Sequence, residues 1–463
     1  MNTPPKLDTL TAKWLPWLVA MSFFMQMLDG TILNTALPAI ARSLNENPLR
    51  MQAVVIAYVL TQAVLIPASG WLTDRWGPGR LMTWSIGLFT LGSLICALST
   101  NIVMMILARV IQGAGGALMM PVGRLVILRL YPKEELVRVL SIIPIPGLFG
   151  SLIGPALGGF LVEYASWHWI FLINIPVGLF GMWATAKLMP RFEPVKTPFD
   201  RAGFAAFGLS LVFISLALEA LSHPGISNLW ALVPAGAGLA AQAFYWLRLS
   251  ERPVSLFKPS IFKTVSFRVG LAANLVARLG SGATPFLLPL LLQVALGYSP
   301  LVAGLMMMPM ALASVGAKLL TRRLASRFQY RAILLANTVI QGLLIASLAL
   351  IGLEMNPVVV CLQLAALGGV NSLQFSFLNT YTLMDLPYAD SGSGNALLSV
   401  MMQLSMSLAV GMAATLLHFF EGPAETAAGT DPGLMLAAFQ YTFLAVGSTS
   451  VFSAALFILS PKK

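Results

Sequence analysis

Long, mostly apolar runs recur along the whole sequence, and they limit what the chain can fold into more than any other feature. An α-helix needs roughly 20 apolar residues to cross the hydrocarbon core of a bilayer. The runs are apolar all round and do not alternate with polar residues, which excludes an outer-membrane β-barrel. Only 10% of the residues are charged, whereas soluble domains carry roughly 25%. The sequence therefore predicts an all-α polytopic membrane protein and excludes a soluble enzyme.

Polar residues, prolines and glycines divide these runs into fourteen predicted transmembrane helices. With a cytoplasmic N-terminus, 22 of the 28 Lys and Arg residues fall in cytoplasmic connections, and two, Arg42 and Arg50, fall in outer ones. This asymmetry follows the positive-inside rule and predicts an even number of spans with both termini in the cytoplasm. It also explains the net charge of +11 without a nucleic-acid partner. The predicted spans are 14–37, 51–72, 81–100, 102–124, 140–163, 167–189, 203–222, 227–247, 269–296, 301–321, 331–353, 357–382, 393–419 and 434–460.

The chain shows signs of two related halves. SGWLTDRWGPGR at 69–80 and LLTRRLASRFQYR at 319–331 each place an Arg–aromatic pair and a further Arg in a short cytoplasmic turn. Related halves are typical of transporters built from repeated bundles. Two longer connections rich in proline and basic residues, 188–202 and 248–268, flank the seventh and eighth spans. We therefore expect an N-terminal six-helix bundle at 1–190, linkers with an inserted helix pair at 191–262, and a C-terminal six-helix bundle at 263–463.

Four sequence motifs occur in order along the chain: LDGTILNTALP at 28–38, GWLTDRWG at 70–77, ILARVIQGAGG at 106–116 and GLFGSLIGPALGG at 147–159. Together they resemble the signatures of the major facilitator superfamily, specifically its fourteen-span drug:proton antiporter branch, and the resemblance covers essentially the whole chain. It implies the major facilitator fold and a secondary exporter that works by alternating access. The second copy of the loop motif departs from the family pattern, because Ser326 stands where an Asp would be expected.

Asp29 lies about midway along the first predicted span. A charged carboxylate is costly in hydrocarbon, so such a group is expected to face a cavity or a partner. Because burial disfavours the charged form, we expect Asp29 to bind and release a proton near neutral pH. Arg109, with Gln112 one turn further along the fourth span, is the candidate partner, and the resemblance suggests that it couples to proton movement. The alternatives are a permanent ion pair, or an Arg109 side chain that only tethers helices.

The second half has no carboxylate that we expect inside the membrane. It has instead Arg278, ten residues into its span, and Lys318, which lies close enough to a basic loop to reach the interface. One acid together with one or two cations favours an anionic or zwitterionic substrate. The candidate substrate-binding residues are Gln26, Asn34, Gln112, Arg278, Lys318, Asn371, Gln374 and Asn395.

Two groups of residues are candidates for controlling conformation. Gly154, Pro155 and Gly158 belong to a stripe of small residues that allows close helix packing, which predicts a seam on which the halves slide or close.

Asp74 and Arg75 follow the second span. Asp74 can bond a helix N-terminus or a basic partner across the two halves when the inner face is closed; the alternative is a solvated loop charge.

The sequence contains no GxxxxGK[ST] loop and no Cys or His cluster with metal-ligand spacing. We therefore expect no enzyme activity, no metal and no cofactor, with the proton gradient as the energy source. The expected function is a proton-coupled antiporter that exports small molecules, with multidrug efflux favoured by the resemblance. The alternative is a proton-coupled exporter of an organic anion such as a polycarboxylate. The expected partners are a small-molecule substrate, protons and the lipid bilayer of the inner membrane, with the protein as a monomer.

Overall fold

The structure is a computed structural model that describes residues 9–459 except 132, 191, 193–194, 196, 222–227, 251, 253, 388–389 and 422–431. All regular structure in these described ranges is helical. Twelve of the helices there are long and apolar enough to cross a membrane. The structure therefore supports the prediction of a polytopic helical membrane protein.

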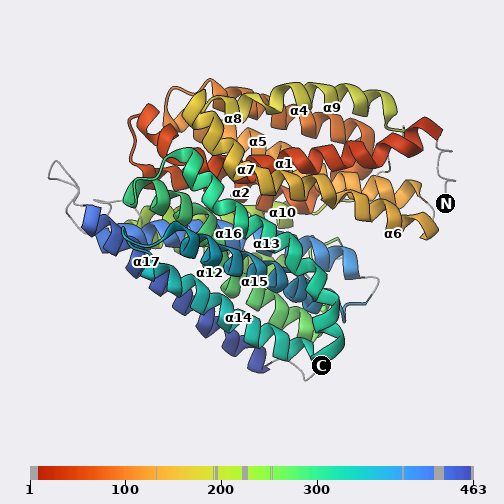
Figure 1. Cartoon of the computed structure of the whole chain (residues 1–463). Helices are drawn as coiled ribbons and strands as arrows, with labels where there is room; N and C mark the ends of the chain where they lie inside the picture. Colours follow the sequence, from red (N-terminus) through yellow and green to blue (C-terminus); the bar gives the residue numbers. More distant parts are fainter. Residues whose placement is uncertain are drawn as a thin grey trace.

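The first half of the chain forms one group of packed helices, drawn from red to yellow in Figure 1. The α7 helix packs along α1, while α5 packs between α2 and α4, and α9 covers α4. The short break between α4 and α5 is stabilised by Asn101, whose side chain accepts a hydrogen bond from the amide of Met104. The helices are α1 (Thr9–Ser43), α2 (Gln52–Leu65), α3 (Ser69–Trp76), α4 (Pro78–Ala97), α5 (Ile102–Leu130), α6 (Lys133–Ile142), α7 (Pro144–Tyr164), α8 (Trp169–Leu172) and α9 (Asn174–Leu188).

The second half forms another group of packed helices, drawn from green to blue in Figure 1. Here α13 packs on α15, α12 on α16, and α14 on α17. Ser299 and Asn356 cap α13 and α15 with their side chains, each followed by a proline at the first helical position. The helices are α12 (Val265–Leu290), α13 (Pro300–Arg327), α14 (Tyr330–Ser347), α15 (Pro357–Leu383), α16 (Ser391–Glu421) and α17 (Pro432–Ser453).

Two further helices lie between these groups in the sequence. They are α10 (Arg201–Leu221) and α11 (Asn228–Phe244), which continues into a π-helical turn at Tyr245–Leu249. The two helices pack on each other, and α10 also packs against α2 of the first half and α16 of the second. The apolar part of α10 that can be evaluated covers Arg201–Ala217, which is shorter than any of the twelve helices that could cross a membrane. The fourteen-span count and the predicted domain boundaries therefore stay predictions.

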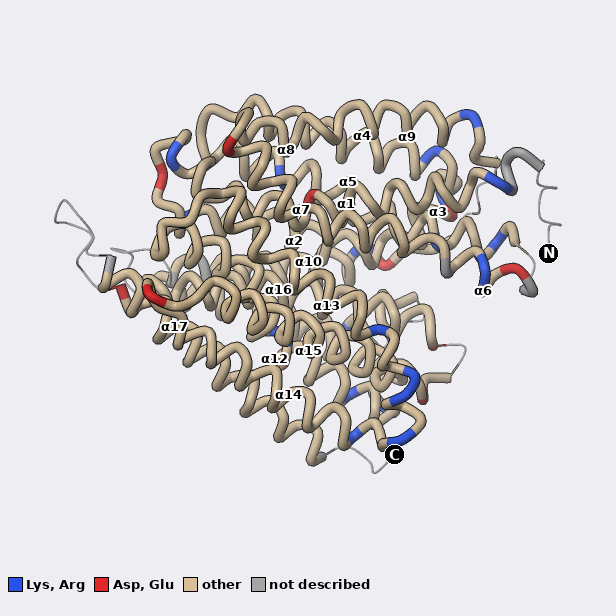
Figure 2. The backbone as a smooth tube through the Cα atoms, viewed as in Figure 1, with Lys and Arg blue, Asp and Glu red and all other residues tan. Residues whose placement is uncertain are grey.

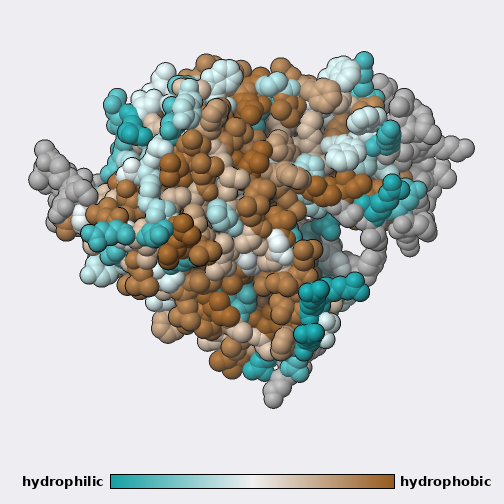
Figure 3. Space-filling model, in the orientation of Figure 1, coloured by the Kyte–Doolittle hydropathy of each residue, from teal (hydrophilic) through white to brown (hydrophobic). Residues whose placement is uncertain are grey.

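The surface has the distribution expected of a protein that lies in a bilayer. Figure 2 shows Lys and Arg gathered mainly at the end of the molecule that holds α6. In Figure 3 a broad band of hydrophobic side chains lies between more hydrophilic ends. Large apolar side chains of this protein are strongly exposed, such as Leu319 at 80% and Phe452 at 78%. Lipid in place of water removes the cost of that exposure.

Candidate functional site

The centre of the first half contains a buried ion pair. Arg109 Nη1 on α5 lies 2.7 Å from Asp29 Oδ2 on α1, and both side chains are only 1% exposed. The structure therefore places Asp29 against the partner that the sequence analysis named. Since a buried charge without a partner is strongly unfavourable, each of these two charges requires the other in this conformation.

Gln112 completes the hydrogen bonding of this pair. Its Nε2 donates to Asp29 Oδ1 at 2.7 Å, and its Oε1 accepts from Arg109 Nη1 at 2.7 Å. Gln112 also donates to Ser93 Oγ at 3.1 Å, and that oxygen accepts from Asn174 at 3.0 Å. Both carboxylate oxygens thus accept a hydrogen bond, and the network joins α1, α4, α5 and α9. Arg109 and Gln112 face Asp29 together because they lie three residues apart on one helix.

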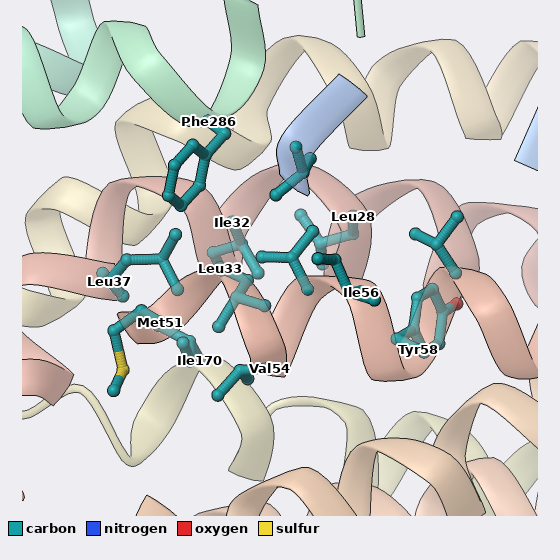
Figure 4. Packing of buried hydrophobic residues seen from close by; sticks show 14 of the residues in the cluster. Leu28, Ile32, Leu33, Leu37, Met51, Val54, Ile56, Tyr58, Ile170 and Phe286 are labelled. Carbon is teal, nitrogen blue, oxygen red and sulfur yellow. The ribbon is translucent and has the colours of Figure 1, made fainter. Parts of the chain in front are cut away.

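Tyr58 on α2 is a member of this site that the sequence analysis missed. The Arg109 guanidinium carbon lies 4.0 Å from the centre of the Tyr58 ring, and Arg109 Nε donates to the Val54 carbonyl at 3.4 Å. A cation over an aromatic face is attracted by the ring quadrupole. Tyr58 belongs to a cluster of buried apolar side chains that also includes Leu28 and Ile56 (Figure 4). The spacing of Tyr58 and Gln62, one turn apart within an apolar run, is the signal that could have identified it.

Two other predicted residues of the first span do not join the network. Asn34 is buried and donates to the carbonyl of Gly30 at 3.2 Å, within its own helix. The Gln26 side-chain oxygen is buried and has no hydrogen-bond partner among the described residues. In the described part of the chain, neither side chain is hydrogen-bonded to Asp29 or Arg109. Gln26 and Asn34 therefore lie outside the hydrogen-bond network of the Asp29–Arg109 pair, and their binding of substrate stays a prediction.

Arg278 on α12 is half-buried, and its partners among the described residues are uncharged. Its Nε donates to Asn274 Oδ1 at 2.8 Å and its Nη2 to Asn379 Oδ1 at 3.2 Å. Its guanidinium carbon lies 4.7 Å from the ring centre of Phe375 on α15. None of the three ion pairs found among the described residues includes Arg278. The second half thus holds a guanidinium group that forms no ion pair with a carboxylate in the described part of the chain.

The other predicted polar residues of the second half divide into two kinds. Gln374 accepts from Asn337 at 2.9 Å and donates to Thr338 at 2.6 Å, and Asn371 accepts from Gln341 at 3.0 Å. These hydrogen bonds join α14 and α15, so they have a structural use whether or not a substrate binds. Lys318 and Asn395, by contrast, lie exposed on α13 and α16.

Asp74 has a different partner from the one expected. Its Oδ1 accepts from Arg129 Nη2 on α5 at 2.7 Å, so the ion pair lies within the first half and does not cross to the second. The reason is geometric, because α3 packs against α5, whose last turn carries Arg129. Both side chains are partly exposed, so the pair contributes little to stability. Arg75 lies over the ring of Trp71, at 5.4 Å from its centre.

The stripe of small residues in α7 has two sides. Added Cβ atoms at Gly154 and Gly158 would collide with Thr31 and Thr35 of α1, so these glycines pack within the first half. The contact between the halves is made by the other side of the helix. A Cβ on Gly304 of α13 would overlap the carbonyl oxygen of Pro155. The predicted seam between the halves therefore includes Pro155, while Gly154 and Gly158 set the spacing of α7 to α1.

Comparison with known proteins places this arrangement in a family. Residues 19–410 match the model of the Major Facilitator Superfamily. Three relatives carry the name "Putative multidrug resistance protein MdtD". The protein of Serratia proteamaculans is 47% identical and covers 94% of this chain and 91% of its own. The protein of Pectobacterium atrosepticum is 45% identical and covers 94% of this chain and 93% of its own. The protein of Salmonella heidelberg is 46% identical and covers 97% of this chain and 95% of its own.

Solved structures of transporters share the fold at low sequence identity. The POT family transporter PepTSo superimposes with a TM-score of 0.71 at 14% identity and covers 96% of this chain and 97% of its own. A mutant of the nucleoside transporter NupG gives 0.68 at 14% identity over 96% and 100%. A D-xylose–proton symporter gives 0.67 at 12% identity over 96% and 97%. The chain is accordingly a multi-pass membrane transporter, not an enzyme, and it belongs to the major facilitator superfamily.

Proposed function

We propose that this transporter is a proton-coupled antiporter that exports small molecules across the inner membrane by alternating access. The observation that carries the proposal is the buried Asp29–Arg109 pair with Gln112 bonded to both partners. In this conformation each carboxylate oxygen accepts a hydrogen bond, one from Arg109 and one from Gln112, so protonation of Asp29 would remove the negative charge that holds Arg109. Proton binding would then release Arg109 and favour a different arrangement of α1 and α5.

The substrate that we favour is a lipophilic drug, and the exported class would be broad. This follows from the name of the MdtD relatives, which describes them as multidrug resistance proteins. An organic anion such as a polycarboxylate is the second candidate. It is favoured by Arg278, which has amide and aromatic neighbours but no place in any ion pair among the described residues. An anionic group would supply the missing opposite charge.

We further propose that α10 and α11 form an inserted pair of membrane helices, which gives fourteen spans with both termini in the cytoplasm. The pair begins after a basic connection, as the positive-inside rule expects for a helix that starts at the cytoplasmic face. The energy source would be the proton gradient, with no bound cofactor. The partners would be the substrate, protons and the bilayer, and the protein would act as a monomer.

The direct test is proton movement in proteoliposomes. Purified protein is reconstituted, a pH gradient is imposed, and organic cations and polycarboxylates are supplied in turn while internal pH is recorded. We expect Asp29→Asn to abolish substrate-driven proton flux while the protein still inserts. The matched control is Glu46→Gln, which removes a partly exposed carboxylate paired with Arg50. Flux at the wild-type level in Asp29→Asn would exclude Asp29 from proton coupling.

A further inference from the structure

The two halves are joined by a hydrogen bond deep inside the protein. Gln403 Nε2 on α16 donates to Gln62 Oε1 on α2. Gln62 is only 2% exposed, and Gln403 is half-buried. The helices that carry these residues pack along each other and form one of the two seams between the halves.

Gln62 lies one turn from the residue that contacts the charge pair. On α2, Tyr58 places its ring against Arg109, and Gln62 follows four residues later on the same face. The Tyr58 hydroxyl and the Gln62 amide nitrogen both lie beside Gly116 of α5, where an added Cβ would come within 2.9 Å and 2.8 Å of them. Both atoms are buried, and within the described residues neither has a hydrogen-bond partner. A continuous line of side chains thus runs from Asp29 through Arg109, Tyr58 and Gln62 to the other half.

Two other side-chain hydrogen bonds join the halves in the described part of the chain, and neither belongs to this line. Gln293 donates to the Thr35 carbonyl at 2.9 Å, and the Leu301 amide donates to Glu163 at 3.0 Å. The described hydrogen bonds of Asp29 and Arg109 include none of these four residues. Of these three side-chain hydrogen bonds between the halves, only the Gln62–Gln403 bond includes a residue of the line that begins at Asp29.

We propose that Tyr58 and Gln62 are positioning residues that transmit the ionic state of the Asp29–Arg109 pair to the α2–α16 seam. The Gln62–Gln403 bond forms in the conformation described here and breaks when the pair separates. When Asp29 binds a proton, Arg109 loses its ionic partner, and its contact with the Tyr58 ring changes because both interactions depend on the position of one guanidinium.

Two amide side chains suit a bond that must open repeatedly inside a membrane protein. A broken ion pair would leave two charges in a medium of low polarity, whereas a broken amide pair leaves neutral groups that water or substrate can satisfy. Gln62 and Gln403 can therefore separate without a charge being stranded. This inference rests on the proposed proton coupling and names the residues that would carry it to the second half.

The test measures the seam directly at two pH values. Spin labels are attached to cysteines that replace Gly70 and Gly392, where a new side chain has open space. Cys361 is replaced by Ala, and Cys96 is buried. Distances between the labels are recorded in reconstituted full-length protein at high and low pH. With no further substitution, we expect the distance distribution to shift with pH, and Asp29→Asn to abolish that shift.

Gln403→Leu is then expected to abolish the same pH-dependent shift, as is Gln403→Met, which keeps the side-chain length. The matched control is Gln363→Leu, which removes a hydrogen bond of 2.7 Å to Ser347 within the second half and should leave the shift intact. Suppose that Asp29→Asn abolishes the pH-dependent change in label distance but a folded Gln403 variant still shows it. That result would overturn the proposed role of the Gln62–Gln403 bond and leave the proposed proton coupling standing. A shift that persists in Asp29→Asn, together with wild-type proton flux, would overturn the proposed coupling itself.

Discussion

Replacement of Asp29 by Asn tests the charge pair most sharply, because the substitution preserves shape and removes one charge. Asp29 accepts two hydrogen bonds, from Arg109 and from Gln112, and an Asn side chain can accept only on its oxygen. The new amide NH₂ would face a donor. Rotation of the Gln112 amide does not solve this, because its oxygen already accepts from Arg109. The variant therefore loses a hydrogen bond and leaves a buried guanidinium without an ionic partner.

The size of the effect follows from these losses. A hydrogen bond to a charged group contributes about 1.5–3 kcal/mol, and loss of one partner of a buried ion pair costs about 3–5 kcal/mol. Because Asn still offers one acceptor to Arg109, we expect Asp29→Asn to lie at the lower end, near ~3 kcal/mol. In the double variant Asp29→Asn, Arg109→Met, the Gln112 amide is free to rotate and accept from Asn. The double variant should therefore be at least as stable as the single one.

The free energy of unfolding is measured by denaturant titration in detergent micelles for the wild type, Asp29→Asn, Arg109→Met and the double variant. Asp74→Asn and Arg129→Met, singly and together, serve as the control cycle, because that pair is partly exposed and each loss should stay below about 1 kcal/mol. Additive effects of the Asp29 and Arg109 substitutions would refute the argument. They would mean that the two groups do not stabilise each other in the membrane-spanning bundle.

The remaining predictions concern the substrate, the seam and the topology. Arg278→Ala should weaken binding of a polycarboxylate more than binding of a cationic dye, measured by equilibrium binding in detergent; equal losses would count against an anionic substrate. Gly304→Val should abolish transport in proteoliposomes, because its side chain would overlap the Pro155 carbonyl, whereas Gly316→Val, which has open space, should transport normally. A cysteine at Glu421 should react with an impermeant maleimide from outside intact cells, and labelling only after permeabilisation would refute the fourteen-span layout.

Helix boundaries could be predicted from neighbouring residues, whereas the partners of some charged side chains depend on how distant helices pack. The breaks that the sequence analysis placed around Asn101 and before Pro300 are confirmed as helix boundaries, because capping residues and proline act on the residues next to them. The Asp29–Arg109 contact could also be anticipated, since few charges lie inside the spans. The partner of Asp74 could not be, because many basic residues lie near the helix ends and only the packing of α3 on α5 selects Arg129.

The sequence by itself determined that the chain is a helical membrane protein. The thickness of the bilayer sets the length of an apolar run, and that length can be counted in the sequence without knowledge of the tertiary structure. It also determined which charges must find partners inside the membrane. Only the tertiary structure decided that Gln112 bonds both members of the pair, that Tyr58 lies over Arg109, and that Gln62 reaches Gln403. These contacts depend on the rotation and depth of each helix against its neighbours. In spans that are apolar on every side, the sequence pattern carries little information about rotation.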